Sequence, residues 1–347
     1  MQINGKEYRS VWYEDNRVFM INQNLLPFRF EIASFGSYEE VVVAIQNMTV
    51  RGAPAIGAAG AYAMALATAT APEDKYRSYL RQAHAALIAA RPTAIDLNNG
   101  VSYVYENALK FIPDVVHSRQ VAELASIEFA NKSAEDCRRI GIIGQEVIPD
   151  GARILTHCNA GALATVDWGT ALSAIRMAHR KGKKLFVYVS ETRPRFQGSR
   201  LTAFELEQEG IEHTIIADSA CGFYFWKDAI DLVITGADRV CLNGDIANKI
   251  GTYEKAVLAK EHKVPFYVAA PLSTFDFTCN HGTDIPIEIR SEDEIKMFGD
   301  TLIANPGSSA LNPSFDITPA KYINGIITHR AIFKPKEAAQ KIQSDLN

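Results

Sequence analysis

Cys158 is the residue of this chain whose type and setting offer the most chemistry. It lies in the segment Thr156-His157-Cys158-Asn159-Ala160-Gly161, after the short apolar run 152–155 and before the stretch Ala164 to His179, which has helical spacing. In open parallel sheets, ligands bind at the carboxyl ends of strands, where helix N-termini offer unpaired N–H groups. A thiol at such a corner can act as a base. The alternative interpretation is a small buried hydrophobic residue, the common fate of a free cysteine.

Asp218 and Asp238 follow two further apolar runs and lead to different predictions. Asp218 precedes Ser219, a pair typical of the cap of a following helix. Asp238 follows Gly236-Ala237, and the chain then passes through a polar stretch to Asn248-Lys249 before a helical pattern resumes. A loop this long and polar favours a role in a functional site over a simple connection.

Three places in the sequence could bind an anion. In the segment Arg51-Gly52-Ala53-Pro54-Ala55-Ile56-Gly57, Pro54 suits the first turn of a helix, and Gly52 lets the main chain approach a ligand. The N–H groups of Gly52 and Ala53, together with the Arg51 guanidinium, would bind a phosphate, although a plain helix start with a surface arginine explains the same residues. Asn248-Lys249 and Gln197-Gly198, each expected at a helix start, repeat this chemistry. The sequence therefore favours a phosphorylated ligand.

The elements that must position these residues fall into two regions. The first 145 or so residues contain a strand-like segment from Tyr8 to Ile21 and then mainly helical patterns. Later, short apolar runs mostly alternate with helical patterns: Ile154-Leu155, Leu185 to Val189, Thr214 to Ala217, Leu232 to Thr235, Phe266 to Ala270 and Gly325 to Thr328. This alternation predicts an α/β protein with a doubly wound parallel sheet. The turn at Pro149-Asp150-Gly151 places a mainly helical domain with short strands at 1–148 and a Rossmann-like domain at 149–347.

Composition excludes several classes of partner. The net charge is −4 with Lys and Arg scattered, which argues against nucleic acid or a membrane as the main partner. The uncharged stretch Ala53 to Ala71 has the length of a membrane span, but its Ala, Gly and Thr content predicts a buried helix. The five cysteines form no metal-ligand spacing, and the polar N-terminus is unlike a signal peptide, so we expect a cytoplasmic protein without a metal. Neither nucleotide-binding glycine motif is present, so no nucleotide cofactor is expected.

Several of these segments together resemble the signature blocks of the methylthioribose-1-phosphate isomerases, a family related to the regulatory subunits of translation initiation factor 2B and to ribose-1,5-bisphosphate isomerase. The matching blocks occur in family order over nearly the whole chain: Arg51 to Gly57, Thr156 to Gly161, Glu191-Thr192-Arg193-Pro194 with Gln197-Gly198, Gly236-Ala237-Asp238-Arg239 with Asn243-Gly244-Asp245, Asn248 to Tyr253, and Asn312 to Pro319. The resemblance implies a helical N-terminal domain, a Rossmann-like C-terminal domain, a homodimer, and an aldose–ketose isomerase of a sugar 1-phosphate that uses no metal or nucleotide.

The resemblance also implies a role for individual residues. Cys158 and Asp238 would be the catalytic pair, and the substrate would be held by Arg51, Gly52, Ala53, Arg91, Gln197, Asn248 and Lys249. A 1-phosphorylated furanose has no free aldehyde, so the ring must open before hydrogen moves from C2 to C1. Asp238, partly desolvated between apolar walls, would donate the proton for ring opening. Cys158, near a helix N-terminus and cations, would be a thiolate base at C2. Transfer through an enediol and transfer as hydride both remain open.

The substrate also remains open between related sugars. The segment Cys221-Gly222-Phe223-Tyr224-Phe225-Trp226 is bulkier than is usual in relatives that act on methylthioribose, and it either packs differently or alters the pocket for the C5 substituent. In the second case 5-deoxyribose 1-phosphate becomes an alternative substrate, because one methylthio group changes apolar burial by only a few kcal/mol. A ribose-1,5-bisphosphate isomerase would need further cations, for which only Arg193, Arg195 and Arg200 are available. A non-enzymatic regulatory subunit and a nicotinamide dehydrogenase are the remaining alternatives.

Overall fold

The computed structural model describes residues 1–92 and 94–344, which form two compact units. The first unit consists of Met1–Arg139 and Ala160–Ser173, and the second of Ile140–Asn159 and Ala174–Asn347. Each unit is therefore built from two stretches of chain.

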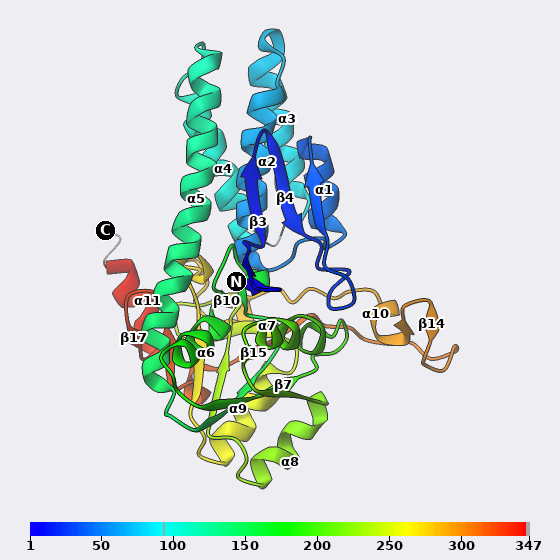
Figure 1. Cartoon of the computed structure of the whole chain (residues 1–347), viewed down its shortest axis with the longest axis vertical. Coiled ribbons are helices and arrows are strands. Elements are labelled where there is room, and N and C mark those ends of the chain that lie inside the picture. The colour runs from blue at the N-terminus through cyan, green and yellow to red at the C-terminus, as the bar shows by residue number, and fades with distance from the viewer. Residues whose placement is uncertain (93, 345–347) are drawn as a thin grey trace. The chain divides into compact units, whose positions relative to one another are not determined.

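The first unit combines a small antiparallel sheet with a bundle of helices (Figure 1). The strands are β1 (Gln2–Ile3), β2 (Lys6–Glu7), β3 (Val11–Glu14), β4 (Arg17–Ile21) and β5 (Ile32–Phe35), with β4 between β3 and β5. The helices are α1 (Tyr38–Gln46), α2 (Ala53–Thr70), η1 (Glu73–Lys75), α3 (Tyr76–Ala89), α4 (Ile95–Leu109) and α5 (Val115–Gly144), with a short turn η3 (Ala162–Ala164). The predicted mainly helical region with short strands is confirmed.

Helix α2 is the buried centre of that bundle. Its side chains from Ala55 to Thr68 are all buried, as the small-residue composition predicted. Glycines let α4 approach closely, because a Cβ atom added at Gly100 would lie 2.2 Å from the carbonyl oxygen of Gly57. No helix in the described part of the chain is long and apolar enough to span a bilayer.

The second unit is organised by a seven-stranded sheet with the order β17-β16-β12-β9-β6-β7-β8. Its strands are β6 (Ala152–Thr156), β7 (Leu185–Ser190), β8 (His213–Ile216), β9 (Leu232–Thr235), β12 (Phe266–Ala269), β16 (Gly325–Ile327) and β17 (Ile332–Phe333). All neighbours are parallel except β16 and β17 at one edge. The six apolar runs identified in the sequence correspond to the six parallel strands, so the α/β fold class is confirmed.

Helices and short turns connect these strands. They are η2 (Gln145–Val147), α6 (Ala171–Arg180), η4 (Gly198–Thr202), α7 (Ala203–Gln208), η5 (Asp218–Ala220), α8 (Cys221–Trp226), α9 (Thr252–Glu261), η6 (Leu272–Thr274), η7 (Gly282–Asp284), α10 (Asp293–Lys296), η8 (Ala320–Tyr322) and α11 (Pro335–Ser344). Helix α6 begins seven residues later than the predicted start at Ala164. The intervening chain turns sharply at Gly169, whose φ is +83° and where an added Cβ would lie 2.5 Å from the main chain of Gly161.

A second, smaller sheet corrects the expectation of a long loop after Asp238. Strands β10 (Arg239–Val240), β11 (Ile246–Lys249) and β15 (Phe315–Thr318) form an antiparallel sheet, while β13 (Met297–Phe298) pairs with β14 (Thr301–Leu302). The Asn243-Gly244 pair turns the chain between β10 and β11, with Gly244 at φ +82°. Asn-Gly is a strong hairpin signal that the length and polarity of this stretch concealed.

Candidate active site at the carboxyl ends of the central strands

The strand order of the second unit changes direction at β6 and β9. From β6 the chain proceeds through β7 to β8 on one side, and then starts again with β9 and continues through β12 to β16 on the other. Cys158 follows the end of β6, and Asp238 follows the end of β9. These two strands are parallel neighbours, so their carboxyl ends lie at the same edge of the sheet. This is the position at which open α/β sheets bind their ligands.

Cys158 is held in an uncommon main-chain conformation. Its φ is +61°, and its side chain is half-buried. Its N–H donates to Thr192 Oγ1 at 2.9 Å, and its carbonyl accepts from Thr202 Oγ1 at 2.6 Å. The next long helix, α6, begins only at Ala171, so the expected helix N-terminus does not directly follow the thiol. Two hydroxyl groups hold this cysteine instead.

His157, the neighbour of Cys158, is a neutral core histidine. It is buried, and its Nε2 lies 2.8 Å from the carbonyl oxygen of Ile250, which can only accept and so requires the proton on Nε2. Burial and the nearby charge of Lys255 lower the pKa of His157 to about 3, against the opposing attraction of Asp218. At neutral pH this imidazole therefore carries no charge.

Asp238 stands at the start of the β10–β11 hairpin. Its N–H donates to the carbonyl oxygen of Ala247 at 2.9 Å, which places it at the same end of the hairpin as Asn248. The residue is exposed, which differs from the partial burial between apolar walls expected from the sequence.

Gln197, Asn248 and Lys249 are buried polar residues of the second unit. Gln197 lies directly before η4, and within the described residues its Oε1 has no hydrogen-bond partner. Asn248 Nδ2 donates to Thr252 Oγ1 at 2.9 Å, and Lys249 Nζ donates to the carbonyl of Ser314 at 2.7 Å. Asn248 and Lys249 end strand β11 instead of beginning a helix, which corrects the prediction from sequence.

The other predicted binding residues belong to the first unit. Gly52 is the N-cap of α2, with φ +95°, and a Cβ there would lie 2.3 Å from the carbonyl oxygen of Ala164. Arg51 Nε donates to Gln23 Oε1 at 3.2 Å, and Ala53 is the first residue of the helix. Arg91 is half-buried in the turn that precedes α4. The main-chain geometry at Gly52 is the close approach that an anion site at a helix N-terminus requires.

Several polar residues of the site edge were not predicted from the sequence. Thr235 Oγ1 and Ser314 Oγ are buried and have no hydrogen-bond partner among the described residues. Asp316 accepts hydrogen bonds from the N–H groups of Gly251, at 2.7 Å, and Tyr253, at 3.1 Å, and burial raises its pKa to about 6. Thr235 could have been found from the sequence, because it ends a predicted strand. Ser314 and Asp316 could not, because their contacts are with residues about 65 positions earlier in the chain.

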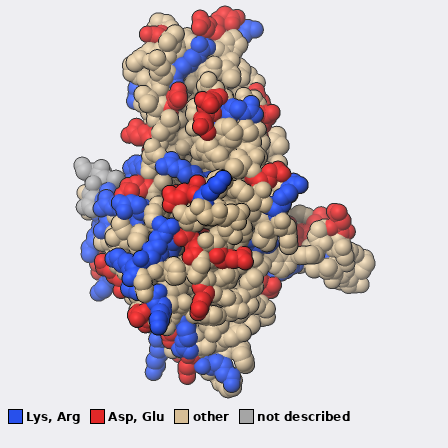
Figure 2. Space-filling view, in the orientation of Figure 1, with Lys and Arg blue, Asp and Glu red and all other residues tan. Residues whose placement is uncertain are grey.

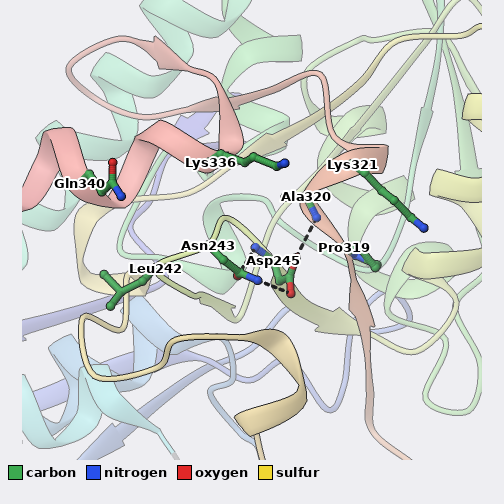
Figure 3. Close-up of a pocket in the computed structure, with 8 residues that line it drawn as sticks. All are labelled: Leu242, Asn243, Asp245, Pro319, Ala320, Lys321, Lys336 and Gln340. Carbon is green, nitrogen blue, oxygen red and sulfur yellow. Dashed lines mark hydrogen bonds between the residues drawn. The ribbon is translucent and has the colours of Figure 1, made fainter.

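A cavity of about 470 Å³ lies at the turn between β10 and β11 (Figure 3). Its lining includes Asn243 and Asp245 but none of the predicted site residues. The Asp245 carboxylate accepts from Asn243 Nδ2 at 2.8 Å and from the N–H of Ala320 at 2.9 Å, as the dashed lines show (Figure 3). The block Asn243-Gly244-Asp245 therefore stabilises the turn between β10 and β11.

Among the described residues, no cluster of three or more His, Cys, Asp or Glu could hold a metal ion.

Charges of both signs are mixed on the face of the molecule that Figure 2 shows. Figure 2 shows Lys and Arg interspersed with Asp and Glu on the face in view, with many of the basic residues toward one side of the second unit.

Helix α8 contains the aromatic segment noted in the sequence. It buries Phe225 in the core and exposes Phe223 and Trp226. This arrangement gives a packing role to Phe225, whereas Phe223 and Trp226 face solvent.

Comparison with known proteins decides the family. Residues 49–335 match the Initiation factor 2 subunit family. The chain belongs to this family. Within it, the chain is 46% identical over 342 residues to a methylthioribose-1-phosphate isomerase of Carboxydothermus hydrogenoformans, covering 96% of this chain and 98% of that protein. The resemblance found in the signature blocks is thereby confirmed.

The chain is similar in structure both to a protein named as an isomerase and to one named as a translation initiation factor subunit. One is the 5-methylthioribose 1-phosphate isomerase of Pyrococcus horikoshii OT3, with a TM-score of 0.92, 42% identity, and coverage of 99% of this chain and 97% of that chain. Another is described as translation initiation factor eIF-2B subunit delta from A. fulgidus, with a TM-score of 0.87, 40% identity, and coverage of 96% and 97%. The fold is shared by both, so the site residues must decide the function.

Proposed function

We propose that this protein is an aldose–ketose isomerase that converts 5-methylthioribose 1-phosphate to 5-methylthioribulose 1-phosphate. The observation that carries the proposal is the placement of Cys158 and Asp238 at the carboxyl ends of β6 and β9, where the strand order reverses. The proposal is supported by similarity to proteins named methylthioribose-1-phosphate isomerase, which align with this chain over nearly the full length of both. A binding or regulatory protein has no need of a thiol and a carboxylate at this edge.

The chemistry assigns a task to each member of the pair. The carboxyl group of Asp238 donates a proton to the ring oxygen as the bond between that oxygen and C1 breaks. The ring oxygen becomes the C4 hydroxyl, and C1 is left as an oxocarbenium stabilised by the phosphate ester oxygen. Asp238 is exposed, so its carboxyl group is accessible to the ring oxygen of the sugar. Cys158, half-buried on the neighbouring strand end, is the base that takes the C2 proton and so forms a C1–C2 enol; the thiol then returns the proton to C1, and the C2 hydroxyl gives its proton to the Asp238 carboxylate. If hydrogen instead moves from C2 to C1 as hydride, the C2 hydroxyl still gives its proton to Asp238, and the pair otherwise mainly stabilises charge.

The remaining residues bind the substrate. Arg51, Gly52 and Ala53 offer a guanidinium and main-chain N–H groups at the start of α2 for the phosphate, with Arg91 as a second cation. Lys249 and Asn248 offer buried donors, and the unpaired Gln197 Oε1 is an acceptor for a sugar hydroxyl. We propose that the protein acts as a homodimer.

Two alternatives of the same class receive less support. A second phosphate would need free cations, but Arg193 donates to the carbonyl of Ile295 at 2.8 Å and Arg195 pairs with Glu294 at 3.1 Å. These contacts engage two of the three arginines that a second phosphate would need, which disfavours ribose 1,5-bisphosphate as substrate. 5-Deoxyribose 1-phosphate differs only in the C5 substituent, so it is expected to compete with the methylthio sugar.

The test is a competition assay followed by phosphorus and proton NMR. Equal concentrations of methylthioribose 1-phosphate and 5-deoxyribose 1-phosphate are offered, and ketose formation from each is measured. Turnover of the methylthio sugar supports the proposal, preference for the deoxy sugar changes the substrate, and turnover of neither favours a regulatory protein. Running the reaction in D₂O separates the two hydrogen transfers, because an enediol route admits solvent deuterium at C1 and a hydride route does not.

Variants assign the catalytic pair. Cys158→Ser and Asp238→Asn are each expected to abolish turnover without changing the melting temperature. Matched controls are Cys221→Ala, a buried cysteine on α8, and Asp231→Asn, whose carboxylate binds Arg153. Both controls should retain wild-type kcat. An active Asp238→Asn enzyme would refute the role of that carboxylate.

A further inference from the structure

The carboxylate of Asp218 binds the loop that follows β7. Its Oδ1 accepts from the N–H of Thr192 at 2.9 Å, its Oδ2 accepts from the N–H of Arg193 at 2.7 Å, and the Ser190 hydroxyl donates to Oδ1 as well. The turn η5, which begins at Asp218, has no side-chain cap. The helix-capping role predicted from the sequence is therefore wrong, because the partners of this carboxylate lie on a neighbouring strand end.

These hydrogen bonds hold Asp218 in its ionised form. Burial by itself would raise the pKa of Asp218, but the hydrogen bonds from Ser190 and from the Arg193 N–H, together with the nearby charge of Lys255, outweigh burial, and the pKa is lowered. Hydrogen bonds to a charged acceptor are about twice as strong as neutral ones. One charged group thus holds residues 190–193 at three points, which are the N–H groups of Thr192 and Arg193 and the side-chain hydroxyl of Ser190.

Thr192 transmits that constraint to Cys158. Its side chain is fully buried, and its hydroxyl accepts from the N–H of Cys158 at 2.9 Å while it donates to the carbonyl of Ser190 at 2.9 Å. Thr192 has φ +66° and Cys158 has φ +61°. This region is unfavourable for a residue with a Cβ, and most of all for a β-branched one, so it persists only where surrounding contacts enforce it.

We propose that Asp218 is a positioning residue for Cys158. By fixing the main chain of residues 192 and 193, it fixes the hydroxyl of Thr192, and this hydroxyl sets the main chain of Cys158 and hence the direction of its thiol. The inference rests on the proposed role of Cys158 in the isomerisation. It adds Asp218 and Thr192 to the residues on which turnover depends, although neither needs to touch the sugar.

Four variants test the inference. Asp218→Asn keeps the size of the side chain but removes its charge and one acceptor, and Thr192→Val removes the hydroxyl but keeps the shape. Thr192→Ser keeps the hydroxyl, and Asp231→Asn removes an aspartate charge elsewhere in the same unit. The measurements are kcat, KM, and hydrogen exchange by mass spectrometry in peptides that contain Cys158.

Loss of positioning should lower kcat and leave substrate binding almost unchanged. Asp218→Asn and Thr192→Val should lower kcat by roughly 10- to 100-fold, the loss expected for one hydrogen bond to a charged or buried group, with little change in KM. Exchange at Cys158 should become faster in both. Thr192→Ser should restore most of kcat and protection, and Asp231→Asn should behave as wild type.

Each contrary result overturns a different statement. Wild-type kcat in Asp218→Asn and Thr192→Val overturns the positioning role, and so does unchanged exchange at Cys158. A Thr192→Ser enzyme as impaired as Thr192→Val also overturns it, because the hydroxyl is then not what matters. An active Cys158→Ser enzyme instead refutes the proposed function of the thiol, and that result is independent of the exchange measurements.

Discussion

Lys249 and Phe315 lie opposite each other on the paired strands β11 and β15, and the ammonium group of Lys249 is 4.5 Å from the centre of the Phe315 ring. The same ammonium donates to the carbonyl of Ser314, and only 5% of the lysine is exposed. A buried cation over an aromatic face is favourable when it is also hydrogen-bonded. The small sheet therefore holds a positive charge in place before any substrate arrives.

Replacing this lysine should weaken substrate binding. Lys249→Met keeps an unbranched side chain over Phe315 but removes the charge, and we expect kcat/KM to fall by roughly 10- to 100-fold, mainly through KM. Lys249→Arg should not restore activity, because its longer planar group cannot occupy the place of a compact ammonium. Steady-state kinetics and the melting temperature of both variants provide the measurement. An unchanged KM in a folded Lys249→Met protein would remove Lys249 from the binding set.

Gly52 should be the least replaceable glycine at the predicted phosphate site. Gly52→Ala places a Cβ 2.3 Å from the carbonyl oxygen of Ala164 and also forces alanine to a φ of +95°, so the loss of unfolding free energy should exceed about 2 kcal/mol. Gly151→Ala is the matched control, because Gly151 has φ +80° with no atom within 4 Å of its added Cβ. Its cost should be about 1 kcal/mol, from the conformation alone. Urea denaturation of both variants measures the difference, and equal losses would contradict the steric argument.

The strands were predictable because each is a local pattern. The run Leu232 to Thr235 is apolar except for its last residue and is buried throughout, as expected of a strand covered on both faces, and the structure places β9 on the same four residues. The start of α6 was not predictable in the same way. Residues 164–170 have helical spacing but are used in tight turns around Gly169, which depend on a main-chain contact with Gly161.

The candidate site shows the same limit. The positions of Cys158 and Asp238 follow from strand ends, which the sequence marks. The partners of Asp218 do not, because an aspartate before a short helical turn is read as its cap, whereas this carboxylate instead meets the N–H groups of Thr192 and Arg193. Which of two nearby sets of N–H groups a carboxylate satisfies is decided by the tertiary fold.

The buried His157 should make the protein less stable in acid. Its pKa is about 3 in the folded chain and about 6.5 in the unfolded chain, so between these values the unfolded state binds more protons. Unfolding free energy should therefore fall as pH decreases below about 6.5, by about 2 kcal/mol at pH 5 from this residue alone. Urea denaturation at pH 7 and pH 5 of wild type and His157→Gln isolates the contribution.

The variant should lose less stability than the wild type over that interval. Asp316 acts in the opposite sense, because its raised pKa of about 6 means that the folded state binds the extra proton below neutrality. Its effect is present in both proteins and cancels in the comparison. Parallel pH dependence of the two proteins would show that His157 is protonated in the folded state.

A buried ion pair beneath Asn159 should be costly to break from one side. Arg176 and Glu205 are separated by 3.1 Å with side chains 3% and 1% exposed, and Glu205 also accepts from Asn159 Nδ2 at 2.9 Å. Glu205→Leu leaves part of the guanidinium without a partner, so a loss of about 3–5 kcal/mol is expected. The double change Arg176→Met with Glu205→Leu should recover much of this loss, because Glu209 keeps its contact with Arg180 at 3.1 Å.

A double-mutant cycle by urea denaturation measures the coupling between Arg176 and Glu205. Additive losses would mean that the two charges are stabilised separately, Arg176 by Glu209 and Glu205 by Asn159, and that the pair itself contributes nothing.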